Sequence, residues 1–165
     1  MVGRDLSILI FQRFSLSFEL DRTLPGMSES VPKPSLAPEP GADNARAHFA
    51  SGLRAAQTGF PDRAAKEFEE AAWLDPENAE IQFNLGTSYL SMGLFEQALV
   101  NLSNAVRIRP DMPDAWGNRA VAYAALGEDG KSLADIDEAE RCGGNRAGLE
   151  TVIDYVKSRR KPKKA

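Results

Sequence analysis

The stretch AEIQFNLGTSYLSMGLFEQALVNLSNAVRIRP, residues 79–110, decides the fold of this chain. It contains two runs of apolar residues at helical spacing, separated by Met92-Gly93. Gly93 can end the first helix because glycine adopts the left-handed conformation at little cost, and Pro110 cannot continue the second. A helical hairpin of this size cannot bury its apolar stripe alone. The stretch therefore requires neighbouring hairpins.

The same pattern returns on both sides of this stretch at a period of 34 residues. Gly59, Gly93 and Gly127 coincide at the turn. Other positions that coincide in three copies are Gly52, Gly86 and Ala120; Ala64, Ala98 and Ser132; Phe68, Leu102 and Ile136; and Ala71, Ala105 and Ala139. The small residues allow close helix approach, and the larger ones fill the space between helices. Three copies of one helical hairpin are therefore expected.

This pattern resembles the tetratricopeptide repeat family, whose signature combines W-x2-L-G-x2-Y, A-x3-F, A and P in one period. The resemblance covers roughly residues 45–144, with copies at 45–78, 79–112 and 113–146 by register. It implies an all-α fold, a right-handed α-solenoid of three hairpins. It also implies a non-enzymatic protein-binding module, such as an adaptor, a scaffold, or a chaperone-like or assembly factor. The fold alone does not identify the partner.

The third copy departs most from the pattern. Ser132 replaces alanine, Arg119 stands where copy two has Leu85, and Gly143-Gly144 replaces the Arg-Pro ending. We expect this copy to be the less stable end of the stack unless another element covers it. Residues 146–158 supply a candidate cap, because four apolar residues share one helical face: Leu149, Val152, Ile153 and Val156.

The first 44 residues differ from the repeats. Residues 1–26 contain one apolar run, LSILIF at 6–11, which is too short to span a membrane. This segment is either a weak targeting segment or not translated natively, in which case Met27 is the start. Residues 27–44 are proline-rich and predict a poorly ordered linker, with Asp43 or Asn44 as the N-cap of the first repeat helix.

Composition argues against catalysis and metal binding. Cys142 is the single cysteine, so no internal disulfide can form and a reducing, cytoplasmic location is expected. It aligns with apolar residues of the other copies, which predicts a buried small side chain. His48 is the only histidine and has no companions at ligand spacing. No cofactor, metal site or nucleophile is indicated.

The C-terminus is basic. Its cationic residues are Lys157, Arg159, Arg160, Lys161, Lys163 and Lys164, and residues 159–165 form the predicted tail. A nucleic-acid- or membrane-surface-associated scaffold that uses this tail is the alternative function. No aromatic residue interrupts the basic ones, so stacking on single-stranded nucleic acid is not indicated. A protein or peptide is the favoured partner, and the sequence does not indicate the oligomeric state.

The resemblance places the binding surface in a concave groove lined by the first helix of each hairpin, which would take an extended or helical peptide. The expected groove residues are Arg46, Phe49, Ala50, Leu53 and Gln57; Glu80, Phe83, Asn84, Thr87 and Ser91; and Asp114, Gly117, Asn118, Val121 and Ala125. Family members that capture acidic C-termini carry Lys and Arg here. Among the matching places Phe49, Leu53, Asn84, Asp114 and Asn118, only Asn84 agrees, which disfavours such a clamp.

Two features of this surface have alternative interpretations. Asn84 and Asn118 occupy the same place in copies two and three, so they can either hold a peptide backbone or tie neighbouring helices together. Trp73 aligns with Arg107 and Arg141, which predicts an exposed side chain. It is either a second binding surface or a surface aromatic without a role.

Overall fold

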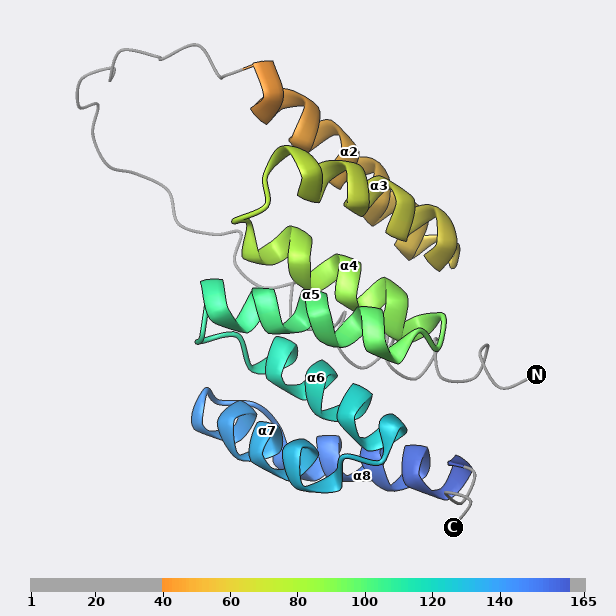
Figure 1. Cartoon of the computed structure of the whole chain (residues 1–165), viewed down its shortest axis with the longest axis vertical. Coiled ribbons are helices and arrows are strands. Elements are labelled where there is room, and N and C mark those ends of the chain that lie inside the picture. The colour runs from red at the N-terminus through yellow and green to blue at the C-terminus, as the bar shows by residue number, and fades with distance from the viewer. Residues whose placement is uncertain (1–39, 161–165) are drawn as a thin grey trace, which may run out of the picture.

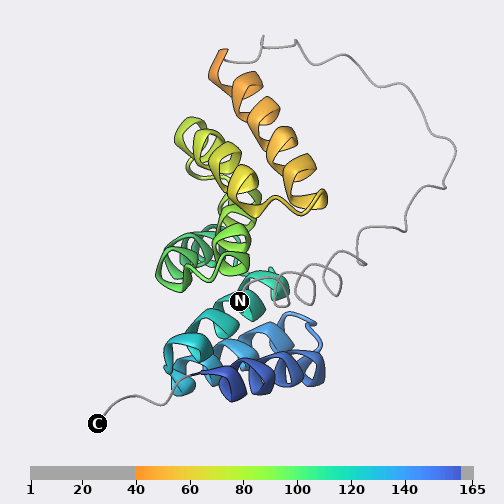
Figure 2. The ribbon, with the colours of Figure 1, turned by 90° about the vertical axis from the view of Figure 1, so that its right-hand side faces the viewer.

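The computed structural model describes residues 40–160, and every element in this range is an α-helix. The helices are α2 (Pro40–Gln57), α3 (Pro61–Leu74), α4 (Ala79–Ser91), α5 (Phe95–Ile108), α6 (Pro113–Leu126), α7 (Asp129–Arg141) and α8 (Arg146–Arg159). They stack along the long axis from α2 at one end to α7 and α8 at the other (Figure 1). The side view shows α2 and α3 paired at one end (Figure 2). The predicted all-α solenoid of three hairpins is confirmed.

Glycines make the hairpins possible in two ways. The turn glycines Gly59, Gly93 and Gly127 have φ of 78°, 75° and 81°, as the repeat register predicts. Within the helices, a Cβ on Gly86 would lie 2.7 Å from Leu102. The first and second helix of the hairpin therefore approach closely only because this position lacks a side chain.

The core runs through the stack as three buried clusters. Phe68 and Leu85 belong to the cluster of the first hairpins. Val106 and Ala115 join α5 to α6. The largest cluster extends from α4 to α8, and its buried members include Leu90, Leu102, Val121, Ile136, Ile153 and Val156. Each hairpin thus buries its apolar stripe against its neighbours.

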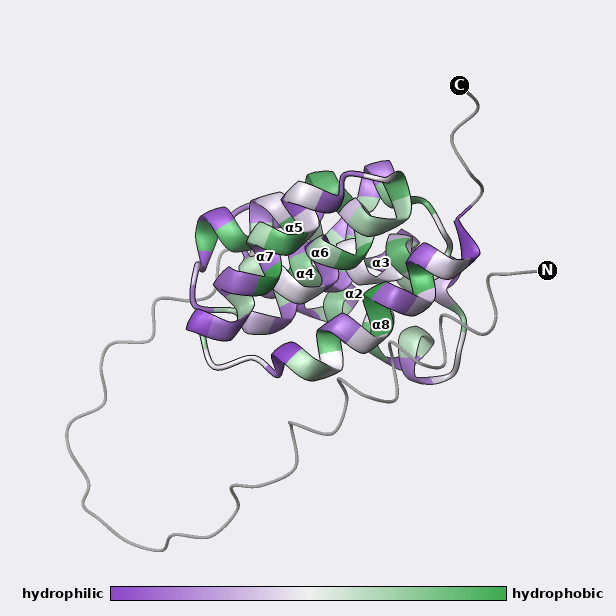
Figure 3. Cartoon of the chain, turned by 90° about the horizontal axis from the view of Figure 1, so that it is seen from below, coloured by the Kyte–Doolittle hydropathy of each residue, from purple (hydrophilic) through white to green (hydrophobic). Residues whose placement is uncertain are grey.

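Helix α8 caps the third hairpin. Leu149, Ile153 and Val156 are buried, and Val152 packs partly against the largest cluster. Seen from this end, the ribbons of α7 and α8 carry many hydrophilic residues (Figure 3). The predicted capping stripe is therefore confirmed, and α8 spans residues 146–159 rather than 146–158.

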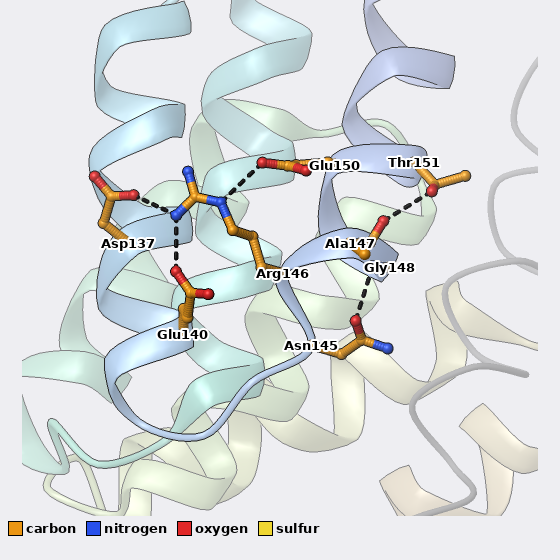
Figure 4. A network of polar contacts seen from close by, with 8 residues as sticks. All are labelled: Asp137, Glu140, Asn145, Arg146, Ala147, Gly148, Glu150 and Thr151. Atoms are coloured by element: carbon orange, nitrogen blue, oxygen red, sulfur yellow. Dashed lines mark hydrogen bonds and ion pairs between the residues drawn. The ribbon is translucent and has the colours of Figure 1, made fainter.

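An arginine fixes each end of α8. Arg146 donates to Asp137 at 2.7 Å and Glu140 at 2.9 Å on α7, and to Glu150 at 2.9 Å on its own helix (Figure 4). These three carboxylates raise the pKa of the guanidinium. At the other end, Arg160 pairs with Asp129 at 2.9 Å and donates to the carbonyl of Ala124 at 3.0 Å. The cap is thus held at both ends as well as by its apolar face.

The unusual residues of copy three are compensated. Arg119 forms two hydrogen bonds with Asp135, at 2.7 Å and 2.8 Å, and both side chains are largely buried. The guanidinium also lies 4.7 Å from the Trp116 ring centroid and 5.8 Å from that of Tyr123. This pairing joins α6 to α7, and no sequence pattern indicated it.

The start of the repeats differs from the prediction. Helix α2 begins at Pro40, inside the predicted linker 27–44, and Asp43 lies in its first turn. The prediction that Asp43 or Asn44 is the N-cap is therefore wrong. Residues 1–39, which include the segment 1–26, and residues 161–165 lie outside the described range. Among the described helices, none combines the length and the hydropathy that a membrane crossing requires.

Candidate functional site

The first helices of the three hairpins form one continuous surface. Helix α4 contacts both α2 and α6, so groove positions from neighbouring copies come together. Partly exposed side chains on these helices are Phe49, Leu53, Phe83, Asn84, Thr87 and Asp114. We call this set the first-helix face. Arg46 and Glu80 flank it and are exposed.

The apolar part of the first-helix face is held firmly by the core. Phe49 and Leu53 pack partly against the first cluster, and the Phe49 ring lies 5.7 Å from that of Phe68. Phe83 packs partly against the two other clusters. Because these side chains are anchored on one side and exposed on the other, a ligand would not have to order them on binding.

The two asparagines have different environments. The Asn84 amide donates to the Glu80 carbonyl of its own helix at 2.8 Å and remains partly exposed. Asn118 is only 2% exposed, and its amide donates to the Thr87 hydroxyl at 2.9 Å. That hydroxyl in turn donates to the Phe83 carbonyl at 2.8 Å. Asn118 therefore ties α6 to α4, and the prediction that both amides line an open groove is wrong for Asn118.

Helix α8 covers most of the third copy's share of the groove. Val121 is 2% exposed and lies in one cluster with Ile153 and Val156. Gly117 is also buried, and a Cβ there would lie 2.7 Å from Leu149. Val121 is therefore not available to a ligand in this structure, contrary to the sequence-based prediction. The accessible face comprises α2, α4 and the first turn of α6.

Three charged residues, Arg46, Glu80 and Asp114, lie one repeat apart; Glu80 and Asp114 are in the first turns of α4 and α6, and Arg46 is in the second turn of α2. Arg46 pairs with Asp43 at 3.7 Å, and Glu80 pairs with Arg109 at 3.3 Å. Asp114 forms no ion pair or side-chain hydrogen bond with any residue of the described range. Burial raises the pKa of its carboxyl group. Asp114 lines a cavity of about 440 Å³ between α6 and α8, which we call the Asp114 cavity.

The second candidate surface contains Trp73. Its side chain is 79% exposed, as its alignment with two arginines predicted. No residue of the described range packs over the Trp73 side chain. Its exposure alone does not test whether it binds a partner, so a binding role for Trp73 remains a prediction.

The predicted basic tail is only partly described. Arg160 belongs to the fold through Asp129, and the guanidinium of Arg159 lies 5.5 Å from the Tyr155 ring centroid. Lys157 is exposed. Lys161, Lys163 and Lys164 lie outside the described residues. The tail therefore has fewer free cations than the sequence suggested, since Arg160 is already paired.

The remaining chemically active residues have structural contacts. The His48 ring nitrogen Nδ1 lies 2.9 Å from Glu67, and the Cys142 thiol lies 3.4 Å from the Pro110 carbonyl oxygen. Cys142 is partly covered rather than fully buried. Within residues 40–160, no three His, Cys, Asp or Glu side chains are grouped in a way that could hold a metal ion.

Comparison with protein families matches this repeat architecture. A "Tetratricopeptide repeat" family matches residues 49–99, and a "TPR repeat" family matches residues 88–127. The "Photosystem I assembly protein Ycf3" of Synechococcus elongatus is 30% identical over 98 residues, which is 58% of this chain and 57% of that protein. The protein of the same name from Acaryochloris marina is 29% identical over 74% of this chain and 75% of its own length. The "Hsp70-Hsp90 organizing protein 2" of Arabidopsis thaliana is 30% identical over 49% of this chain but only 14% of its length.

Solved structures share the fold. The Arabidopsis OM64 TPR domain superposes with a TM-score of 0.65 at 18% identity, covering 72% of this chain and 98% of that domain. The "TPR2B-domain:pHsp70-complex of yeast Sti1" gives a TM-score of 0.64 at 18% identity, covering 72% of this chain and 99% of that one. At such identities the likeness concerns the fold alone. The chain spans only 57% of the length of the first curated relatives that it matches.

Proposed function

Because this chain belongs to the tetratricopeptide repeat family, we propose that it is a non-enzymatic adaptor or assembly factor that binds a protein segment on its first-helix face. The observation that carries the proposal is the anchored, partly exposed apolar surface of Phe49, Leu53 and Phe83. Apolar side chains held in place from one side lose little conformational freedom when a ligand covers the other.

The polar surroundings of this surface favour an apolar ligand over an acidic one. Asn84 and Thr87 are the neutral polar residues of the face, and Asp114 adds a carboxyl group at its edge. The flanking cations Arg46 and Arg109 are already paired with Asp43 and Glu80, so an acidic C-terminus would meet the Asp114 carboxyl group rather than a set of free cations, and like charges in proximity cost binding energy. We therefore propose a ligand segment with hydrophobic side chains, in extended or helical form.

The assembly role is supported by the relatives. Ycf3 proteins are described as photosystem I assembly proteins, and two of them match 58% and 74% of this chain. Because the first relatives are matched over little more than half of their length, we infer the class of role and not its target. The single cysteine is compatible with the cytoplasmic location that we propose.

The test is affinity capture with two matched variants. Asn84→Arg places a long charged side chain on the first-helix face, while Val100→Arg places the same side chain on α5, where Val100 is 63% exposed. Partners that bind the first-helix face should be retained by wild type and Val100→Arg and lost with Asn84→Arg. Circular dichroism of each variant controls for folding. Equal capture by both variants, or loss with Val100→Arg alone, would overturn the proposal.

A further inference from the structure

The repeat register identifies an acidic residue whose equivalent in copy two has an ion-pair partner that the described part of copy three lacks. In copy two, Glu80 pairs with Arg109, the residue that follows α5. One repeat later, the equivalent of Glu80 is Asp114, and the equivalent of Arg109 is Gly143. Copy three therefore keeps the carboxylate and lacks the guanidinium that neutralises it in copy two.

The backbone also changes at this position. Arg109 has φ of −133°, whereas Gly143 has φ of 91°, a conformation that side-chain-bearing residues rarely adopt. Gly144 follows, and a Cβ there would lie 2.8 Å from the Ala139 carbonyl oxygen. Two glycines thus turn the chain tightly from α7 into α8, and neither of them places a side chain in the space beside Asp114.

That space is the Asp114 cavity. Its lining comes from the first turn of α6, the glycine link and the first turns of α8, and includes Pro113, Asp114, Gly144, Gly148, Thr151 and Val152. Asp114 is the only charged residue among the lining residues that the structure describes. Arg146 lies in the sequence between the lining residues Asn145 and Ala147, but its guanidinium is held by three carboxylates and does not line the cavity.

Other groups of the lining do not replace the missing cation. The Asn145 side-chain oxygen Oδ1 accepts a hydrogen bond from the Gly148 backbone amide at 3.0 Å, and the Thr151 hydroxyl donates to the Ala147 carbonyl at 2.8 Å. Burial raises the pKa of the Asp114 carboxyl group, so its surroundings disfavour the charged form. A cation brought by a ligand would restore the pairing that copy two makes internally.

We propose that the Asp114 cavity binds a cationic side chain, an arginine or a lysine, presented by the segment that occupies the first-helix face. That the side chain belongs to the partner rests on the proposed function; cation binding by the cavity does not. Asp114 lies at the α8 end of the face, so it would fix the direction of the bound segment. The ligand then combines hydrophobic side chains with one basic side chain beyond them.

The experiment uses the full chain and a small probe that needs no partner. N-acetyl-arginine methylamide is titrated into ¹⁵N-labelled protein, and its citrulline analogue serves as the neutral control of the same shape. We expect saturable shifts of the Gly144, Gly148 and Leu149 amides with the arginine probe. Asp114→Asn should weaken that binding by about tenfold, the size of a close charge pair.

Glu80→Gln is the matched control, because Glu80 already has an internal partner. It should leave probe binding at the Asp114 cavity unchanged. Shifts that do not saturate, that are equal for the citrulline analogue, or that persist in Asp114→Asn would each overturn the proposal. Since partner capture is measured separately, failure of the cation site and failure of the first-helix face give different results.

Discussion

The pairing of Arg119 with Asp135 should be the most sensitive polar contact in the stack. The Asp135 side chain is 6% exposed and that of Arg119 is 16% exposed, with hydrogen bonds of 2.7 Å and 2.8 Å between them. Arg119→Ala would leave the Asp135 carboxylate buried without its cation. Loss of one partner of a buried pair costs about 3–5 kcal/mol, and we expect the lower end because Arg119 retains some exposure.

The repeat itself supplies a compensated double variant. In copy two the equivalent residues are Leu85, which is 4% exposed, and Asn101. Arg119→Leu with Asp135→Asn therefore transfers a neutral pair that already fits this hairpin geometry. The leucine would lie beside the rings that now stack on Arg119. We expect the free energy of unfolding of the double variant to lie within about 1 kcal/mol of that of wild type, because replacing a buried ion pair with uncharged residues is often neutral.

The assay is equilibrium unfolding in urea, followed by circular dichroism and by tryptophan fluorescence. Trp73→Phe gives a background in which Trp116 is the only tryptophan, and its ring lies 4.7 Å from Arg119. A local probe is needed because repeat arrays do not always unfold in one step. The double-mutant cycle should give a coupling energy of about 2 kcal/mol. A single-variant loss below about 1 kcal/mol, or a double variant as unstable as the sum of both singles, would refute this reasoning.

Three further outcomes are expected. Asn118→Ala should lower the urea midpoint because Asn118 links α6 to α4, whereas Asn84→Ala should leave it nearly unchanged, and the reverse order would contradict the assigned roles. Ending the chain at Gly144 removes four capping side chains worth on the order of 6 kcal/mol before entropy, so the product should melt lower and aggregate in size-exclusion chromatography. Burial is the main cause that raises the pKa of Tyr89 to about 12, and a hydrogen bond to the Glu69 carboxylate is the second. The free energy of unfolding should therefore be unchanged below pH 10 and fall as the pH rises toward 12. Tyr89→Phe should flatten that fall relative to the control Tyr155→Phe; parallel alkaline melting curves would contradict it.

The hairpins could be predicted from the sequence because their determinants are local and repeated. Gly93 and Gly127 have positive φ, and Gly86 packs against Leu102, where the repeat register aligns a small residue on the first helix with a large residue on the second. The capping helix was predictable for the same reason, since its apolar residues lie on one face. The exposure of Trp73 followed from the charged residues at its equivalent positions.

The extent of the candidate site could not be predicted, because α8 has no counterpart in the repeat register. Asn118 and Val121 occupy groove positions, but the contacts that bury them come from α4 and α8. The hydrophobic periodicity of a capping helix does not specify how much of the preceding hairpin that helix covers. The start of α2 at Pro40 was missed because proline suggested a linker, although proline is tolerated in the first turn of a helix.

The departures of copy three are adaptations to the cap rather than signs of a degraded repeat. Gly117 stands where the other copies have phenylalanine, and only a glycine there leaves room for Leu149. Gly143 and Gly144 replace the Arg-Pro ending and turn the chain from α7 into α8. The same changes shorten the accessible face, and within residues 40–160 they leave Asp114 without the cation that Glu80 has in copy two. Gly117, Gly143 and Gly144 therefore let α8 cap the stack and also shape the α8 end of the surface proposed for binding. The stability of the cap and the selection of a ligand at this end of the surface thus depend on the same three residues.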